Sequence, residues 1–148
     1  MPRKAARAKQ AKGLALSTVA EGAAPPSEWR PRAVEAARDF AIDIARAARE
    51  DQCEDILVLD LRGISPVCDF FVIATGTSDR QMRAVVDHVE AMGKPRGEKP
   101  YGIAGYEEGA WIVVDYVDVV VHLFDPEHRL YYDLESLWGD CPRLKWER

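Results

Sequence analysis

The strongest constraint on the fold of this chain is a pair of β-forming segments separated by a single residue. WIVVDY (111–116) and DVVVHLF (118–124) are rich in valine and aromatic residues and lie on either side of Val117. No helix fits between them, so we expect two strands that meet at a hairpin. EDILVLDL (54–61) and DFFVIATG (69–76) add two strands that are apolar on both faces, a pattern typical of central strands covered on two sides.

Two helices are predicted from apolar residues that recur every three or four positions. The first covers residues 31–50. Its apolar stripe consists of Val34, Ala37, Ala41, Ile44 and Ala48. The second begins at Ser78, because Ser78 and Gln81 form the S-x-x-Q pattern of a capping box. Its stripe consists of Met82, Val85, Val86, Val89 and Met92.

A weak strand near residues 101–104 and a final helix complete the predicted order αββαβββα. Asp125 and Pro126 open this last helix. Leu130, Leu134 and Leu137 follow at spacings of four and three residues, which places them on one helical face. The sequence therefore predicts a mixed α/β fold without internal repeats.

The first 28 residues differ in composition from the rest of the chain. Residues 1–20 contain five basic residues and no acidic residue, so the chain's net charge of −5 leaves −10 on residues 21–148. We predict a disordered basic arm (1–28), one domain (29–142) and a C-terminal tail (143–148). Phosphate backbones repel an acidic domain, which favours a basic protein as its partner. The basic, acid-free start is also compatible with a mitochondrial transit peptide.

Several classes of protein are disfavoured by composition. No run of eighteen apolar residues is present, so we expect no membrane-spanning segment. Cys53, Cys68 and Cys141 are odd in number and lack C-x-x-C or C-x-x-H spacing, which argues against a disulfide framework and a zinc site. A reducing compartment fits these cysteines, and we expect a cytoplasmic protein without a cofactor.

Two segments carry residue types used in phosphate and metal chemistry. TGTS (75–78) joins a strand to a helix N-terminus, which can bind an anion, but it lacks the P-loop and dinucleotide-binding patterns. Asp115 and Asp118 resemble the acid pair that holds Mg²⁺ in nucleotidyltransferases. Their spacing of three would point them to opposite faces of a continuous strand, whereas a shared metal requires a spacing of two. We therefore predict no catalytic residues and no metal site.

The remaining candidates are histidines and aromatic residues. His88 and His128 occupy ordinary helical surface positions, whereas His122 shares a strand face with apolar residues and is either buried or presented to a partner. Six aromatic residues gather near the C-terminal end, where they serve the core or an interface. They are Trp111, Tyr116, Phe124, Tyr131, Tyr132 and Trp138.

Residues 31–142 resemble the ribosomal silencing factor, or Iojap-like, family. The segments that carry this resemblance are 54–61, 69–90 and 105–140, in the family's order and spacing. The resemblance implies a mixed five-stranded sheet flanked by helices, similar to nucleotidyltransferases but without their activity. It also implies binding to the fourteenth protein of the large ribosomal subunit, which blocks association with the small subunit and represses translation.

The resemblance further implies which residues contact the partner. The family's W-x-V-x-D strand matches Trp111, Val113 and Asp115, and its H-x-F and Y-x-L elements add His122 and Tyr132. These five residues are the predicted partner-binding site. The basic arm offers a weak contact to ribosomal RNA, and a homodimer remains open.

Two departures from the family pattern bear on this prediction. Val117 stands where the family usually has glycine, so the hairpin either uses an ordinary conformation or is strained. Ala104 stands where the family usually has a glutamate. The alternative functions are a metal-dependent enzyme acting through Asp115 and Asp118, and a large-subunit assembly factor of a mitochondrial-type ribosome.

Overall fold

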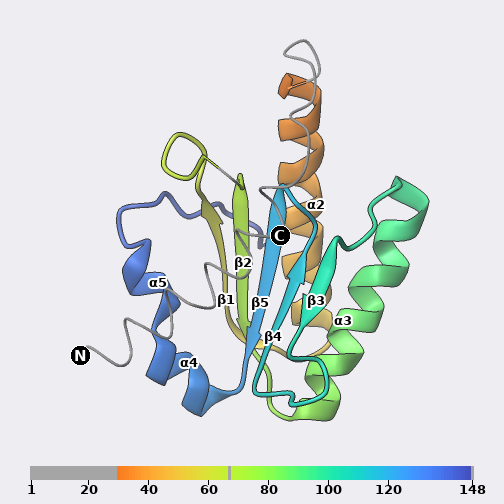
Figure 1. Ribbon diagram of the computed structural model, residues 1–148, viewed down its shortest axis with the longest axis vertical. Helices are drawn as coiled ribbons and strands as arrows, with labels where there is room; N and C mark the ends of the chain where they lie inside the picture. The colour runs from red at the N-terminus through yellow and green to blue at the C-terminus, as the bar shows by residue number, and fades with distance from the viewer. Residues whose placement is uncertain (1–29, 67, 148) are drawn as a thin grey trace.

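The computed structural model describes residues 30–147 except residue 67, with side chains from residue 34 onward, and is shown in Figure 1. The predicted arm, residues 1–28, lies outside this range. The elements are α2 (Arg30–Glu50), β1 (Glu54–Asp60), β2 (Phe70–Thr75), α3 (Asp79–Gly93), η2 (Lys94–Arg96), β3 (Gly102–Ala104), β4 (Trp111–Asp115), β5 (Val119–Phe124), α4 (Pro126–Tyr132) and α5 (Leu134–Leu137).

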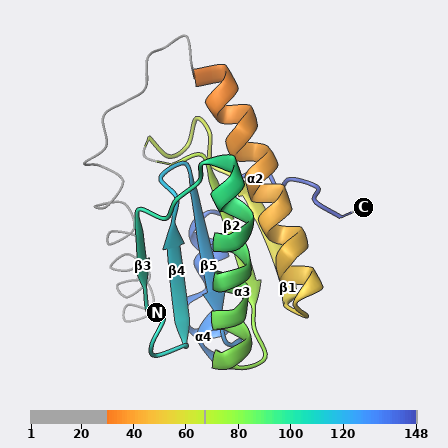
Figure 2. The same ribbon diagram turned by 90° about the vertical axis from the view of Figure 1, so that its right-hand side faces the viewer.

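The five strands form one mixed sheet in the order β1-β2-β5-β4-β3. β2 and β5 are parallel, and the other neighbouring pairs are antiparallel. Figure 2 shows α2 and α3 side by side on one face of the sheet, whereas α4 and α5 lie across the other face. The predicted mixed α/β architecture is confirmed. Among the described helices, none is long and apolar enough to cross a membrane.

The predicted stripes of the first two helices face the sheet. Ala37, Ala41, Ile44 and Ala48 of α2 are at most 4% exposed, and four of the five apolar residues predicted for α3 are buried. Ser78 caps α3 as predicted: its Oγ accepts a hydrogen bond from the Gln81 amide at 3.0 Å. These contacts build the larger of two cores, between the helices and the sheet.

The predicted final helix is divided, and its expected apolar face is wrong. Asp133 adopts a left-handed conformation, with φ 48°, and separates α4 from α5. Leu134 is buried, but Leu130 is 77% exposed and Leu137 39% exposed. The break changes the helix direction, so spacing along one continuous helix no longer predicts which residues share a face.

The C-terminal residues and β1 also differ from expectation. β1 is an edge strand of the sheet, although its apolar pattern predicted a central strand. Its outer edge is covered by the end of the predicted domain and by the predicted tail, through hydrogen bonds from Asp60 N to Pro142 O (2.8 Å) and from Leu144 N to Val58 O (2.8 Å). Trp146 is only 7% exposed and belongs to the larger core. β1 is therefore paired along part of its outer edge, and its residues from Ile56 onward are mostly buried.

The β4–β5 hairpin shows whether Val117 adopts an ordinary or a strained conformation. Val117 has φ 75°, and the Asp118 amide donates to the Tyr116 carbonyl across it at 2.9 Å, which forms a tight γ-turn. The carboxylate of Asp115 accepts a hydrogen bond from the Val117 amide at 2.7 Å. A β-branched residue is rarely found in this region of φ, so the hairpin is strained at Val117.

Candidate functional site: an aromatic surface

Aromatic side chains from β4, β5 and α4 meet on the sheet face opposite α2 and α3. The Trp111 ring lies 4.6 Å from that of Phe124 and 4.3 Å from that of Tyr132, measured between centroids. The hairpin register places Trp111 opposite Phe124, and α4 brings Tyr132 over both. We call Trp111, Tyr131 and Tyr132 the aromatic surface, since Tyr131 packs edge-on against Tyr132 at 5.2 Å and is 37% exposed.

His122 contacts the Trp111 indole and fixes its orientation. The Trp111 indole N–H donates to His122 Nδ1 at 3.2 Å, so Nδ1 carries no proton. Burial lowers the pKa of His122 to about 3, which keeps the imidazole neutral and places its proton on Nε2. The His122 ring also packs against Phe71, at 4.6 Å. The imidazole thus fixes the indole orientation and does not act as a general base at neutral pH.

Arg129 fixes α4, and with it Tyr132, against the sheet. Its guanidinium is buried and donates to Thr75 Oγ1 at 2.8 Å and to the Asp55 carbonyl at 2.6 Å. It also forms an ion pair with Glu135 at 2.8 Å. One side chain therefore ties α4 to β1, β2 and α5. No local pattern predicts this role, because Asp55 and Thr75 lie 74 and 54 residues away from Arg129 in the sequence.

Four of the five residues of the predicted partner-binding site lie together, whereas Asp115 lies at the hairpin end of β4, and the five differ in exposure. Trp111 and Tyr132 are partly exposed. Val113, Asp115 and His122 are 7%, 3% and 0% exposed. Val113 and His122 therefore lie beneath the surface and can support a contact made by the two aromatic residues, whereas Asp115 stabilises the hairpin. Tyr131, which the prediction omitted, adds exposed area to that contact.

The phosphate and metal candidates have structural roles in this fold. The hydroxyl of Thr75 accepts from Arg129, and the Gly76 amide donates to the Phe124 carbonyl at 2.7 Å. Asp115 is buried in the hairpin, whereas the pKa of Asp118 is raised by desolvation and then by Asp69. Within residues 30–147, residue 67 excepted, no group of three or more His, Cys, Asp or Glu side chains is arranged to hold a metal ion.

The other titratable candidates have ordinary partners. His88 Nδ1 lies 2.8 Å from Asp51, and His128 Nδ1 lies 2.7 Å from Asp125. The cysteines are free and buried. Burial raises the pKa of Cys68 to about 12, so its thiol is a poor nucleophile.

Comparisons with known proteins agree with this architecture. The family model described as "Ribosomal silencing factor during starvation" matches residues 34–148. The ribosomal silencing factor of Bacillus subtilis is 44% identical over 102 residues, covering 68% of this chain and 86% of that protein. A mouse protein named "Mitochondrial assembly of ribosomal large subunit protein 1" is 35% identical and covers 67% of this chain, which spans 45% of its length.

A solved structure supports the same assignment. A crystal structure of a Chromobacterium violaceum protein superposes with a TM-score of 0.65 at 36% identity, covering 72% of this chain and 86% of that one. Sequence and fold thus agree over most of the described domain. The chain belongs to the ribosomal silencing factor family, whose members regulate translation and bind the ribosome.

Proposed function

We propose that this protein binds the large ribosomal subunit through its fourteenth protein, and that the bound domain then blocks the small subunit sterically. The observation that carries the proposal is the aromatic surface. Trp111 and Tyr132 are partly exposed yet held in place by neighbouring side chains. Aromatic residues of this kind anchor protein interfaces, because they bury a large area with little loss of side-chain freedom.

The charge of the domain supports a basic partner. Residues 21–148 carry a net charge of −10, so attraction to a basic ribosomal protein accelerates encounter and disfavours direct contact with ribosomal RNA. Ala104 packs beside the core of the aromatic face, where a family glutamate would add a further carboxylate. Its absence leaves the binding energy more dependent on the aromatic residues.

Binding to the isolated fourteenth large-subunit protein tests this contact. Trp111→Ala should weaken binding by about 2–4 kcal/mol if Trp111 is the anchor. Tyr101→Ala is the matched control, since Tyr101 is 47% exposed and lies in the loop before β3. Circular dichroism verifies that each variant is folded. Equal affinity of Trp111→Ala and the parent protein would refute the assignment.

Assembly of the large subunit is a second candidate that uses the same contact. It is suggested by the name of the mouse relative. The two functions differ in timing: an assembly factor binds precursor particles, whereas a silencing factor binds mature subunits. Comparing affinity for the two kinds of particle separates them, because preference for precursors would favour assembly.

The enzyme alternative has little structural support. The Asp115 carboxylate is committed to the Val117 amide, so it is poorly placed to share a metal with Asp118. A thermal-shift titration with Mg²⁺, Mn²⁺ and nucleoside triphosphates should leave the melting temperature unchanged. A rise that Asp118→Asn abolishes would instead support metal-dependent chemistry.

A further inference from the structure

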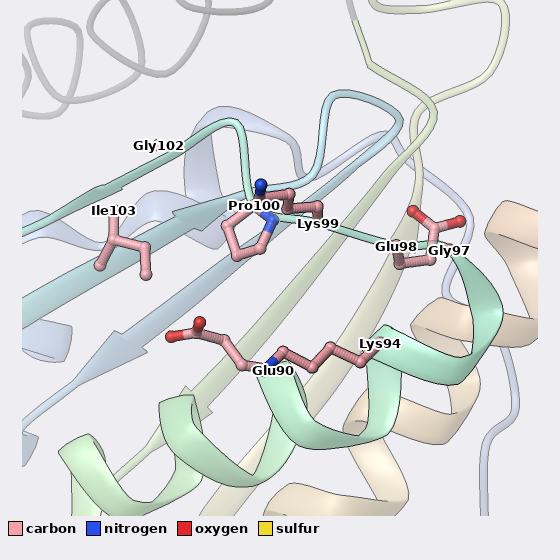
Figure 3. Close-up of a pocket in the computed structure, with 8 residues that line it drawn as sticks. All are labelled: Glu90, Lys94, Gly97, Glu98, Lys99, Pro100, Gly102 and Ile103. Carbon is pink, nitrogen blue, oxygen red and sulfur yellow. The ribbon is translucent and has the colours of Figure 1, made fainter.

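An acidic groove runs between α3 and β3, away from the aromatic surface. One hollow of about 650 Å³ is lined by Glu90, Lys94, Glu98 and Ile103 among others (Figure 3). A second, of about 550 Å³, shares Glu90 and Ile103 with the first, so the two form one continuous groove. Five acidic residues and two lysines line it, for a formal net charge of −3. The acidic residues are Asp87, Glu90, Glu98, Glu107 and Glu108.

One buried tyrosine hydroxyl lacks a hydrogen-bond partner among the described residues. Tyr116 is 4% exposed, and its hydroxyl is buried and forms no hydrogen bond with the described residues. Burial, and then the charges of Glu90 and Glu98, raise the pKa of Tyr116 above its ordinary value. An unpaired buried hydroxyl is unfavourable. Glu90 and Glu98 themselves line the groove, so a guanidinium or ammonium group lying there can pair with these carboxylates.

β3 provides a second feature suited to an extended ligand. It is the outermost strand at its end of the sheet, so one side of its backbone has no strand neighbour among the described residues. Exposed Ile103 offers an apolar surface for the aliphatic part of a lysine or arginine side chain. An extended basic segment can therefore lie along β3 and insert its charges between the acids.

The chain itself contains such a segment outside the matched family region. Residues 1–20 include Arg3, Lys4, Arg7, Lys9 and Lys12 and no acid. The 18 residues from Lys12 to Arg30 can extend to about 60 Å, which exceeds the roughly 30 Å length of α2. Asp43 of α2 pairs with Arg96, so the groove begins beside the middle of α2. Covalent attachment also gives the segment a high effective concentration.

We propose that residues 3–12 bind in the groove between α3 and β3 of the same molecule. This contact neutralises charge in the acidic groove and masks the open edge of β3. It is independent of the proposed ribosomal contact, which uses the opposite face of the sheet. The arm is thus an intramolecular ligand of the domain.

Paramagnetic NMR on the full chain tests the proposal. A nitroxide attached to Ala8→Cys, after replacement of the buried cysteines by alanine or serine in a folded background, should broaden the amide signals of Glu90, Glu98 and Ile103 at low salt. The broadening should disappear in 1 M salt, where the screening length falls to about 3 Å. It should also disappear in the variant Glu90→Gln, Glu98→Gln.

The matched control is Glu127→Gln, Asp140→Asn, which removes two exposed acids outside the groove and should leave the broadening unchanged. Mixing spin-labelled, unenriched protein with unlabelled, ¹⁵N-enriched protein reports only contacts between molecules. Broadening in that mixture would assign the groove to a second copy and overturn the proposal. Absence of groove broadening at low salt, or equal loss in the control variant, would overturn it as well.

Discussion

Replacing Val117 tests whether the β4–β5 hairpin stores backbone strain. At φ 75° a residue with a Cβ is disfavoured by about 1–2 kcal/mol, whereas glycine has no such penalty. A comparison of Val117→Gly with the wild type alone would combine this gain in stability with the loss in stability from removing a half-buried side chain. Val117→Ala loses nearly the same contacts but keeps the Cβ. We therefore expect Val117→Gly to be more stable than Val117→Ala by about 1 kcal/mol.

Urea denaturation followed by circular dichroism measures this difference. For a domain of this size 1 kcal/mol corresponds to a shift of about 4 °C in melting temperature. Ala84 provides the opposite control, because it is exposed on α3 and Ala84→Gly should destabilise the protein by about 1 kcal/mol. Glycine should thus stabilise position 117 and destabilise position 84. If Val117→Ala equals or exceeds Val117→Gly in stability, the hairpin is not strained.

Two further substitutions test the support of the aromatic surface. Burial lowers the pKa of His122 to about 3, so the unfolded chain binds a proton that the folded protein excludes between about pH 6.5 and 3. The free energy of unfolding should fall on acidification across this window by up to about 1.4 kcal/mol per pH unit. In His122→Asn, the free energy of unfolding measured in urea should depend less steeply on pH. An unchanged slope would contradict this. Arg129→Met should cost about 3 kcal/mol because Glu135 and two buried acceptors lose their donor. A loss below about 1 kcal/mol in the same measurement would show that Arg129 does not hold α4.

The elements with regular periodicity were predictable from sequence. The stripe of α2, the capping box at Ser78 and the adjacent strands around Val117 all appear where local patterns placed them. These features depend on residues that are close together in the sequence, so the local pattern predicts them directly. The unexpected exposure of Leu130 arose from a single left-handed residue, Asp133, which a helical spacing rule does not detect.

Features that depend on distant segments were not predictable. The apolar pattern of β1 predicted a strand covered on two faces, and most of its residues from Ile56 onward are buried. The hydrogen bonds along its outer edge come from Leu144 and Trp146, about 90 residues away. In the candidate site, strand alternation placed His122 on a face with the apolar residues of its own strand but could not determine the depth of His122 or Trp111. Only the arrangement of α4 over that face distinguishes the buried imidazole from the partly exposed indole.

Light scattering from purified ribosomal subunits tests the central claim most directly. Large and small subunits are mixed with increasing amounts of this protein, of Trp111→Ala, or of the control Tyr101→Ala, each verified as folded. The parent protein and the control should inhibit subunit joining in proportion to dose, and Trp111→Ala should require a much higher concentration. Normal joining in the presence of saturating, folded parent protein would contradict the account.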